Sequence, residues 1–252
     1  MKFHPVRPET RELRLSVPGP YTGVPLLVMH AARSSGAFRG TVLHYHGLTE
    51  KKEQYRGLLS EYAARGFLAV GVDAIGHGER RAQEFDLETS DFRNVLRWVE
   101  ESAAEVSAVL DALTALVGPG IGPAAVSGVS FGGYIAFAAT AREPRVTALV
   151  SILGSPDLTD GGRYRELAGR SPHREPARFA PRPVLAINAA LDQSVPAAHA
   201  RSFIDALRPL YAAQPERLAY HEFPSSGHFI TEPEWDVAWE RTHAWLERFL
   251  PA

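Results

Sequence analysis

Apolar residues in this chain are gathered into short runs that are separated by longer amphipathic or polar segments. The run from 67 to 73 is apolar enough for a strand that is buried on both faces of a sheet. Residues 11–17 instead alternate between polar and apolar side chains, which predicts a half-exposed strand near a sheet edge, paired with residues 24–30. Further strands are predicted at residues 41–45, 124–129, 146–153, 183–189 and 218–223.

Segments with helical periodicity separate the predicted strands. The longest, 91–117, is amphipathic and ends at Gly118. Strands that alternate with helices indicate an α/β fold with a mostly parallel, doubly wound sheet of about eight strands, preceded by an antiparallel pair. A chain of 252 residues can form this fold as one domain, so we expect residues 1–252 to be a single domain. Other helices are predicted at residues 53–65, 133–139, 196–207 and 235–250.

One segment, residues 155–182, has the pattern of neither a strand nor a long helix. Its glycines and prolines predict a short lid or loop insertion. The segment carries six arginines against four acidic residues, which is a small positive excess. Two interpretations stay open: the arginines form a solvated lid surface, or they help to bind an acidic group of a substrate.

Composition and charge argue against several classes of function. A net charge of −2 gives no reason to expect nucleic acid or an anionic membrane as a partner. Because the chain has no cysteine, it has no disulfide, thiolate nucleophile or thiolate metal site. The first residues lack the apolar core of a secretory signal, and no run approaches the roughly 18 apolar residues of a membrane span. We therefore expect a soluble cytoplasmic protein.

Ser130 lies at the centre of the most informative motif, Gly128-Val129-Ser130-Phe131-Gly132. The motif joins a predicted strand to a predicted helix. A serine on such a sharp turn has a strained backbone and exposes its hydroxyl at the carboxyl end of the strand. Gly128 and Gly132 suit positions where a side chain would collide as the strand and helix pass each other. The context predicts a nucleophile elbow, and the alternative is a glycine-rich turn with a bystander serine.

A serine hydroxyl becomes a nucleophile only if a base removes its proton during attack. Reactive groups gather beyond the carboxyl ends of parallel strands, so the base and its orienting acid should follow later strands. Asp192 follows the strand at 183–189, and His228 follows the final strand. The order Ser130, Asp192, His228 is the nucleophile-acid-base order that accompanies an elbow of this type. Taken alone, Asp192 could be a turn residue that caps a helix, and His228 an exposed loop histidine.

Acyl transfer also requires donors for the developing oxyanion. We expect one backbone N–H from Phe131, immediately after the nucleophile. The second should come from Leu48, in a loop where Gly47 lets the backbone turn an N–H inward. The rival interpretation of this region is a metal site at His44 and His46, which share one strand face, but no further His or Asp follows at a useful spacing.

Together these motifs resemble the α/β-hydrolase fold, and within it the single-domain esterases related to prolyl oligopeptidase catalytic domains and dienelactone hydrolases. Two departures are visible: dienelactone hydrolases use a cysteine nucleophile, which this chain lacks, and many relatives have a glycine where this chain has Ala189-Ala190. His77 and Arg80 are expected to be structural. The resemblance covers roughly residues 24–250 and rests on His46-Gly47-Leu48, residues 73–80, residues 128–133, residues 192–196 and Gly227-His228.

The resemblance implies a serine carboxylic-ester hydrolase that works through an acyl-enzyme and needs no cofactor or metal. Ser130 would attack, His228 would move the proton, and Asp192 would orient the imidazole. The expected partner is a small-molecule ester, and the sequence does not indicate the oligomeric state. Because fold does not determine substrate, the alternatives are an aminopeptidase or thioesterase on the same triad and, from another class, a hydrolase-like binding protein without turnover.

The insertion at 155–182 and the loop at 79–90 are too short to form a large cap over the site. A shallow pocket should reward only short acyl chains, because each further methylene gains free energy only where apolar surface encloses it. A preference for long chains would require Tyr164, Leu167 and Phe179 to build a deeper apolar tunnel.

Overall fold

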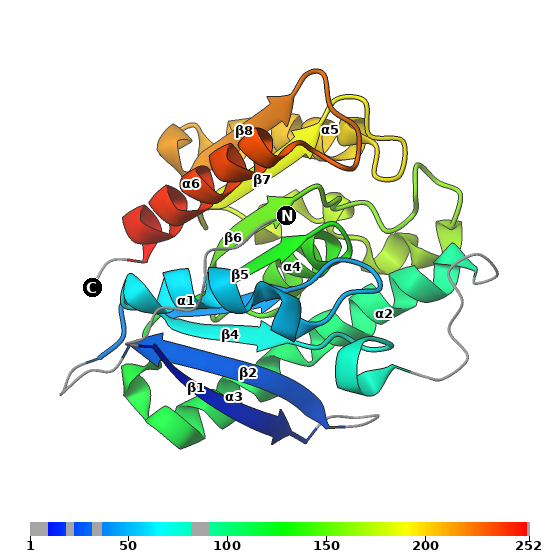
Figure 1. The fold of residues 1–252 in the computed structure, drawn as a ribbon. Coiled ribbons are helices and arrows are strands. Elements are labelled where there is room, and N and C mark those ends of the chain that lie inside the picture. The colour runs from blue at the N-terminus through cyan, green and yellow to red at the C-terminus, as the bar shows by residue number, and fades with distance from the viewer. Residues whose placement is uncertain (1–9, 19–22, 32–36, 82–90, 251–252) are drawn as a thin grey trace.

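The computed structural model describes residues 10–18, 23–31, 37–81 and 91–250. Within these ranges the chain forms an eight-stranded sheet with helices on both faces (Figure 1). The predicted α/β fold with a mostly parallel, doubly wound sheet is therefore confirmed. The strands are β1 (Thr10–Val17), β2 (Val24–Ala31), β3 (Thr41–Tyr45), β4 (Leu68–Val72), β5 (Ala124–Val129), β6 (Val146–Ile152), β7 (Val184–Ala189) and β8 (Leu218–Phe223).

The sheet order is β1-β2-β4-β3-β5-β6-β7-β8. β1 pairs with β2 and β2 with β4 in antiparallel register, and all later pairs are parallel. The chain adds β4 on one side of β3 and β5 on the other, so the strand order reverses at β3. At such a point the loops after neighbouring strands separate and leave a crevice beyond their carboxyl ends, which is where ligands bind in open α/β sheets.

Six α-helices and eight short 3-10 helices accompany the sheet in the described residues. The α-helices are α1 (Arg56–Ala64), α2 (Phe92–Ala104), α3 (Val106–Val117), α4 (Phe131–Arg142), α5 (Ala197–Leu207) and α6 (Glu232–Phe249). The 3-10 helices are η1 (Lys52–Tyr55), η2 (Gly78–Arg80), η3 (Pro119–Ile121), η4 (Arg165–Arg170), η5 (Pro172–Arg174), η6 (Pro176–Arg178), η7 (Arg208–Tyr211) and η8 (Pro215–Arg217).

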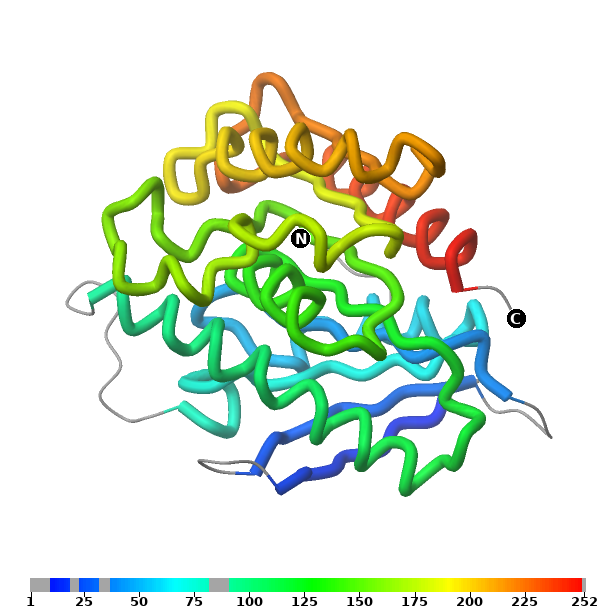
Figure 2. The backbone as a smooth tube through the Cα atoms, turned by 180° about the vertical axis from the view of Figure 1, so that it is seen from behind, coloured from blue at the N-terminus to red at the C-terminus, as the bar shows by residue number. Residues whose placement is uncertain are grey.

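Each face of the sheet has its own apolar core. α1 and α6 lie on the near face in Figure 1, and their buried residues, among them Leu59 and Leu246, form one cluster with the sheet. α3, α4 and α5 lie on the far face, which Figure 2 turns toward the reader, and Leu113, Ile135 and Phe203 belong to the second cluster. β3, β4 and β5 lie between the two cores and are buried along their whole length, as their apolar composition requires.

The prediction of a single long helix at 91–117 is wrong, because the structure divides this segment into α2 and α3 at Glu105. At this residue the backbone N–H bonds to the Ser102 carbonyl, three residues back, and helical pairing is interrupted. The Glu105 carboxylate accepts two hydrogen bonds of 2.7 Å from the Arg80 guanidinium. Apolar periodicity continues through the break, so the pattern alone could not show it.

The insertion at 155–182 packs onto the body of the protein. Phe179 meets the ring of Phe203 edge-on, with 5.0 Å between the ring centroids. Five of the six arginines are exposed, and three of these pair with carboxylates, Arg163 with Asp160, Arg170 with Glu100 and Arg178 with Glu175. The exposure and pairing favour the interpretation of these arginines as solvated surface.

Across the described ranges, no helix has both the length and the apolar character that crossing a bilayer would require.

Candidate active site

Ser130 occupies the turn between β5 and α4 with φ 51° and ψ −113°. A positive φ is strained for a residue with a side chain, and such strain persists only where the surroundings enforce it. Here the backbone has no room for side chains at the flanking glycines. A Cβ on Gly128 would lie 2.2 Å from the Gly132 carbonyl oxygen, and a Cβ on Gly132 would lie 2.1 Å from the Tyr45 carbonyl oxygen.

The structure brings Ser130, Asp192 and His228 together from the loops after β5, β7 and β8. Ser130 Oγ lies 2.9 Å from His228 Nε2, and His228 Nδ1 lies 2.7 Å from Asp192 Oδ2. When His228 Nδ1–H donates to the carboxylate, Nε2 is left as the acceptor for the serine hydroxyl proton. The three side chains thus form one hydrogen-bonded row that can carry a proton away from Ser130.

Asp192 uses its two carboxylate oxygens for two tasks. Oδ1 accepts the backbone N–H groups of Ser194 and Val195, each at 2.8 Å, while Oδ2 accepts from His228. The turn role considered as an alternative for Asp192 is therefore present together with the contact to the imidazole. The Asp192 side chain is fully buried, so water does not compete for these bonds.

A cavity of about 420 Å³ opens beside Ser130 and His228. Its walls are mainly apolar, and no residue of the insertion at 155–182 lines it. Tyr164, Leu167 and Phe179 are buried in the core instead. The loop at 79–90, the other predicted cover, lies outside the described residues beyond Arg81. The apolar side chains of the lining belong to Leu48, Phe92, Val95, Leu96, Val99, Val129, Phe131, Leu153, Val195, Phe229 and Trp235.

The contribution of α2 to this wall was missed from the sequence. Val95 and Val99 lie on the apolar stripe of their helix, which is expected to face a core. In the structure the same stripe meets both the core and the cavity. Periodicity reports which side of a helix is apolar and gives no signal for whether that side faces side chains or a ligand.

Phe131 and Leu48, the predicted oxyanion donors, both line the cavity. Phe131 is the first residue of α4, and the first N–H groups of a helix have no acceptor within it. The N-terminal end of the helix also carries a partial positive charge that favours a developing anion.

The peptide between Gly47 and Leu48 is held by its carbonyl group. Gly47 O accepts His46 Nδ1–H at 2.8 Å and the Glu50 N–H at 3.2 Å. His46 Nε2 in turn accepts the N–H of Ala74 at 3.2 Å, which defines the ring as the neutral Nδ1–H form. Because a trans peptide directs its C=O and N–H to opposite sides, fixing the carbonyl also fixes the direction of the Leu48 N–H.

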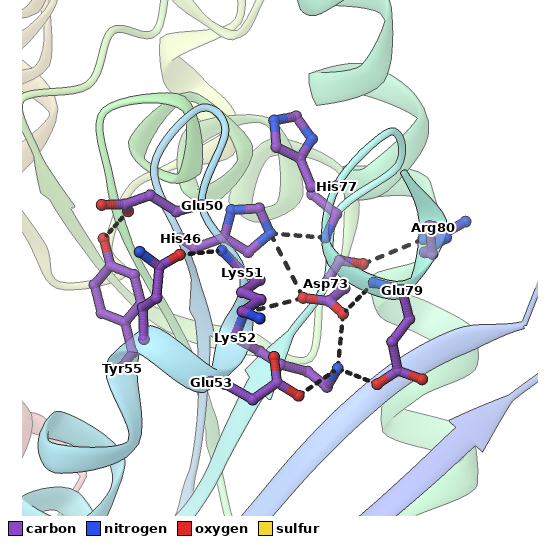
Figure 3. A network of polar contacts seen from close by, with 12 residues as sticks. His46, Glu50, Lys51, Lys52, Glu53, Tyr55, Asp73, His77, Glu79 and Arg80 are labelled. Carbon is purple, nitrogen blue, oxygen red and sulfur yellow. Dashed lines mark hydrogen bonds and ion pairs between the residues drawn. The ribbon is translucent and has the colours of Figure 1, made fainter. Parts of the chain in front are cut away.

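His77 and Arg80 brace the neighbouring loop, in line with the structural role expected for them. The His77 ring stacks on Phe131 with 4.7 Å between centroids. Arg80 is nearly buried and holds Glu105 through both arms of its guanidinium. Figure 3 shows His77 and Arg80 on the loop that follows β4, beside Asp73.

His44 and His46, considered as a metal pair, have separate partners. His44 Nδ1 lies 3.1 Å from Ser127 Oγ, and His46 bonds to Gly47 and Ala74. Over the described residues, no three His, Cys, Asp or Glu side chains are grouped so that they could hold a metal ion.

Because these two histidines are buried, we expect the free energy of unfolding to fall in mild acid. Burial lowers the pKa of His44 to about 3 and that of His46 to about 4. Between these values and the unfolded value near 6.5, the unfolded chain binds more protons, so the free energy of unfolding falls as pH decreases. We expect a loss of about 1.4 kcal/mol per imidazole between pH 7.5 and pH 5.5.

Urea denaturation at the two pH values measures this loss. His44→Phe keeps a ring at the site and removes one titrating group, so the loss of stability between the two pH values should shrink by that one group's share, about 1.4 kcal/mol; His243, whose pKa burial also lowers to about 3, adds to the loss that remains. Equal stability of the parent protein at pH 7.5 and 5.5 would contradict the assignment of neutral buried rings.

Two models of serine hydrolase families match this chain, and a relative named as an esterase aligns with most of it. The family model described as serine aminopeptidase, S33, matches residues 36–168, more than half of the chain, and that of the prolyl oligopeptidase family matches residues 153–251. The Bacillus subtilis protein named "Putative esterase YitV" is 26% identical over 262 residues, which cover 91% of this chain and 96% of that protein.

Solved structures show the same fold. TT1662 from Thermus thermophilus has a TM-score of 0.78 and 26% identity, with 96% of this chain and 99% of that chain covered. A puromycin-hydrolyzing peptidase of Mycobacterium tuberculosis has a TM-score of 0.75 and 23% identity, and the match covers 96% of this chain and 40% of that longer one.

Proposed function

The chain belongs to the serine aminopeptidase S33 family of the α/β-hydrolase superfamily, and we propose that it is a serine carboxylic-ester hydrolase for short-chain acyl esters. The observation that carries this proposal is the row Ser130–His228–Asp192, of which Ser130 and His228 line an apolar cavity. The name of the Bacillus subtilis relative adds support for ester substrates.

The reaction follows from the geometry. Ser130 Oγ attacks the ester carbonyl carbon while His228 Nε2 takes the hydroxyl proton, and Asp192 stabilises the imidazolium that forms. The N–H groups of Leu48 and Phe131 bind the oxyanion of the tetrahedral intermediate. The C–O bond to the leaving group then breaks, and His228 returns the proton to the departing alcohol. A water molecule, activated by the same histidine, hydrolyses the acyl-enzyme and regenerates Ser130.

The size of the acyl group is the first test. We expect kcat/KM on p-nitrophenyl esters to be highest for acetate to butyrate and to fall steadily toward octanoate. Tyr164, Leu167 and Phe179 pack in the core and do not extend the cavity, so additional methylenes find little apolar surface. A maximum at decanoate or beyond would replace this proposal with a lipase.

An aminopeptidase or a thioesterase on the same triad is the second candidate, and one observation favours the aminopeptidase. Glu50 is the only carboxylate among the residues that line the cavity in the described chain, and no lysine or arginine lines it. Its Oε2 is held by the Gly47 N–H at 2.8 Å and the Tyr55 hydroxyl at 2.5 Å. A fixed carboxylate beside an apolar pocket can pair with the ammonium group of an aminoacyl substrate.

The two candidates are separated with butyryl and alanyl p-nitroanilides and the matching p-nitrophenyl esters, assayed side by side. An esterase cleaves the butyryl ester far better than either anilide, whereas an aminopeptidase prefers the alanyl anilide over the butyryl one and loses that preference in Glu50→Gln. A binding protein without turnover, the alternative from another class, would cleave none of them; the assembled row of three side chains argues against it.

A further inference from the structure

The loop that carries Leu48 is attached at both ends to Asp73 and Ala74, the two residues that follow the neighbouring strand β4. At its start, His46 Nε2 accepts the N–H of Ala74 at 3.2 Å. At its finish, the backbone N–H of Lys52 donates to Asp73 Oδ1 at 2.9 Å. The two residues that directly follow β4, Asp73 and Ala74, therefore supply both anchoring points of the loop. Figure 3 shows Asp73 beside Lys52 and His46.

Asp73 and Lys52 also form a buried ion pair. Lys52 Nζ lies 2.7 Å from Asp73 Oδ2, and the two side chains are 1% and 0% exposed. The same oxygen accepts the Glu79 N–H at 3.0 Å. Although burial opposes it, the hydrogen bonds to Asp73, Glu79 and Glu53 raise the pKa of Lys52, so the ammonium stays charged. A buried carboxylate with this set of donors fixes its partners firmly, because an unpaired charge there would be costly.

The segment between the two anchors is strained. Thr49 has φ 68°, which is unfavourable for a β-branched side chain, and it directly follows the Leu48 donor. A backbone of this kind persists only where the surrounding contacts enforce it. The hydrogen bonds at Ala74 and Asp73 are contacts that can do so.

We propose that Asp73 and Lys52 are positioning residues, whose ion pair holds the Leu48 N–H where it binds the oxyanion. This inference rests on the proposed hydrolase function. Neither side chain lines the cavity, so they act through the loop and not on the substrate. The pair should therefore matter for the transition state and much less for binding of the ground state.

Asp73→Asn tests the proposal. The amide keeps the shape but loses the charge, and one of its atoms becomes a donor that faces Lys52. We expect kcat on p-nitrophenyl butyrate to fall about tenfold to a hundredfold, less than the loss of an oxyanion donor outright, with KM changed by less than about threefold. The affinity for an aryl trifluoromethyl ketone, whose adduct with serine carries an oxyanion, should fall by the same factor.

Two further variants make the result decisive. Glu79→Gln removes the charge of one carboxylate that contacts Lys52 Nζ. The Glu79 side chain is largely exposed, so this variant should fold even where Asp73→Asn does not. It should lower kcat and ketone affinity together by about twofold to fivefold. Glu143→Gln is the control: it breaks the Glu143–Arg145 pair at the far end of α4 and should change neither kcat nor ketone affinity.

A role in folding alone would lower the melting temperature of these variants without changing the ketone affinity of the folded protein, and that result overturns the proposal. So does a loss of kcat with unchanged ketone affinity. Failure of the hydrolase function itself is recognised separately, because the parent protein would then cleave no ester.

Discussion

Replacement of Ser130 by alanine is expected to lower ester turnover by about six orders of magnitude, the loss seen when a triad serine is removed. The structure explains why no other side chain should compensate. Ser130 is the serine whose hydroxyl lies 2.9 Å from His228 Nε2, whereas Ser127 and Ser151 are buried within strands β5 and β6. The fold should be unaffected, because alanine retains the Cβ that the positive φ already accommodates.

Covalent labelling provides the measurement. An organophosphonate should modify the parent protein once, and mass spectrometry should place the adduct on the peptide that contains Ser130. Ser130→Ala should lose the label, and Ser225→Ala, on the exposed loop before His228, should keep it. An adduct on a different serine would refute the assignment of the nucleophile.

The strands and the elbow could be predicted because their physical causes are local. A buried parallel strand must be apolar throughout, and residues 124–129 satisfy this requirement within six positions. The glycines around Ser130 are required by the close approach of α4 to the sheet, which every such turn shares. The positions of Asp192 and His228 followed from the rule that reactive groups lie beyond the carboxyl ends of parallel strands.

The cavity wall and the anchoring of the loop that carries Leu48 depend on contacts that no local pattern records. Lys52 meets Asp73 across 21 positions, and the sequence shows Lys52 only as a charged residue in a polar segment and Asp73 only as the last residue of an apolar run. A lysine at that position is expected to be solvated, and only the folded chain shows it to be buried. The break between α2 and α3 also coincides with a contact that is distant in the sequence, because the Glu105 carboxylate at the break pairs with the Arg80 guanidinium.

Asp192→Asn is expected to lower kcat by about four orders of magnitude while the fold is retained. The reason lies in the two tasks of the carboxylate. Two backbone N–H groups, of Ser194 and Val195, point at Oδ1, so the amide oxygen of an asparagine must take that position. Its NH₂ group then occupies the position of Oδ2, 2.7 Å from His228 Nδ1.

An amide N–H at that position donates to His228 Nδ1 and reverses the hydrogen bond of the parent protein. The imidazole must then carry its proton on Nε2, where it faces Ser130 Oγ and can no longer accept the hydroxyl proton. Nitrogen NMR of labelled histidine should show the proton on Nδ1 in the parent protein and on Nε2 in the variant. If Asp192→Asn retains activity within about tenfold of the parent, the tautomer argument fails. Another carboxylate, Asp73 or Asp157, would then have to orient the base, although Asp73 is paired with Lys52 and Asp157 accepts from Thr159.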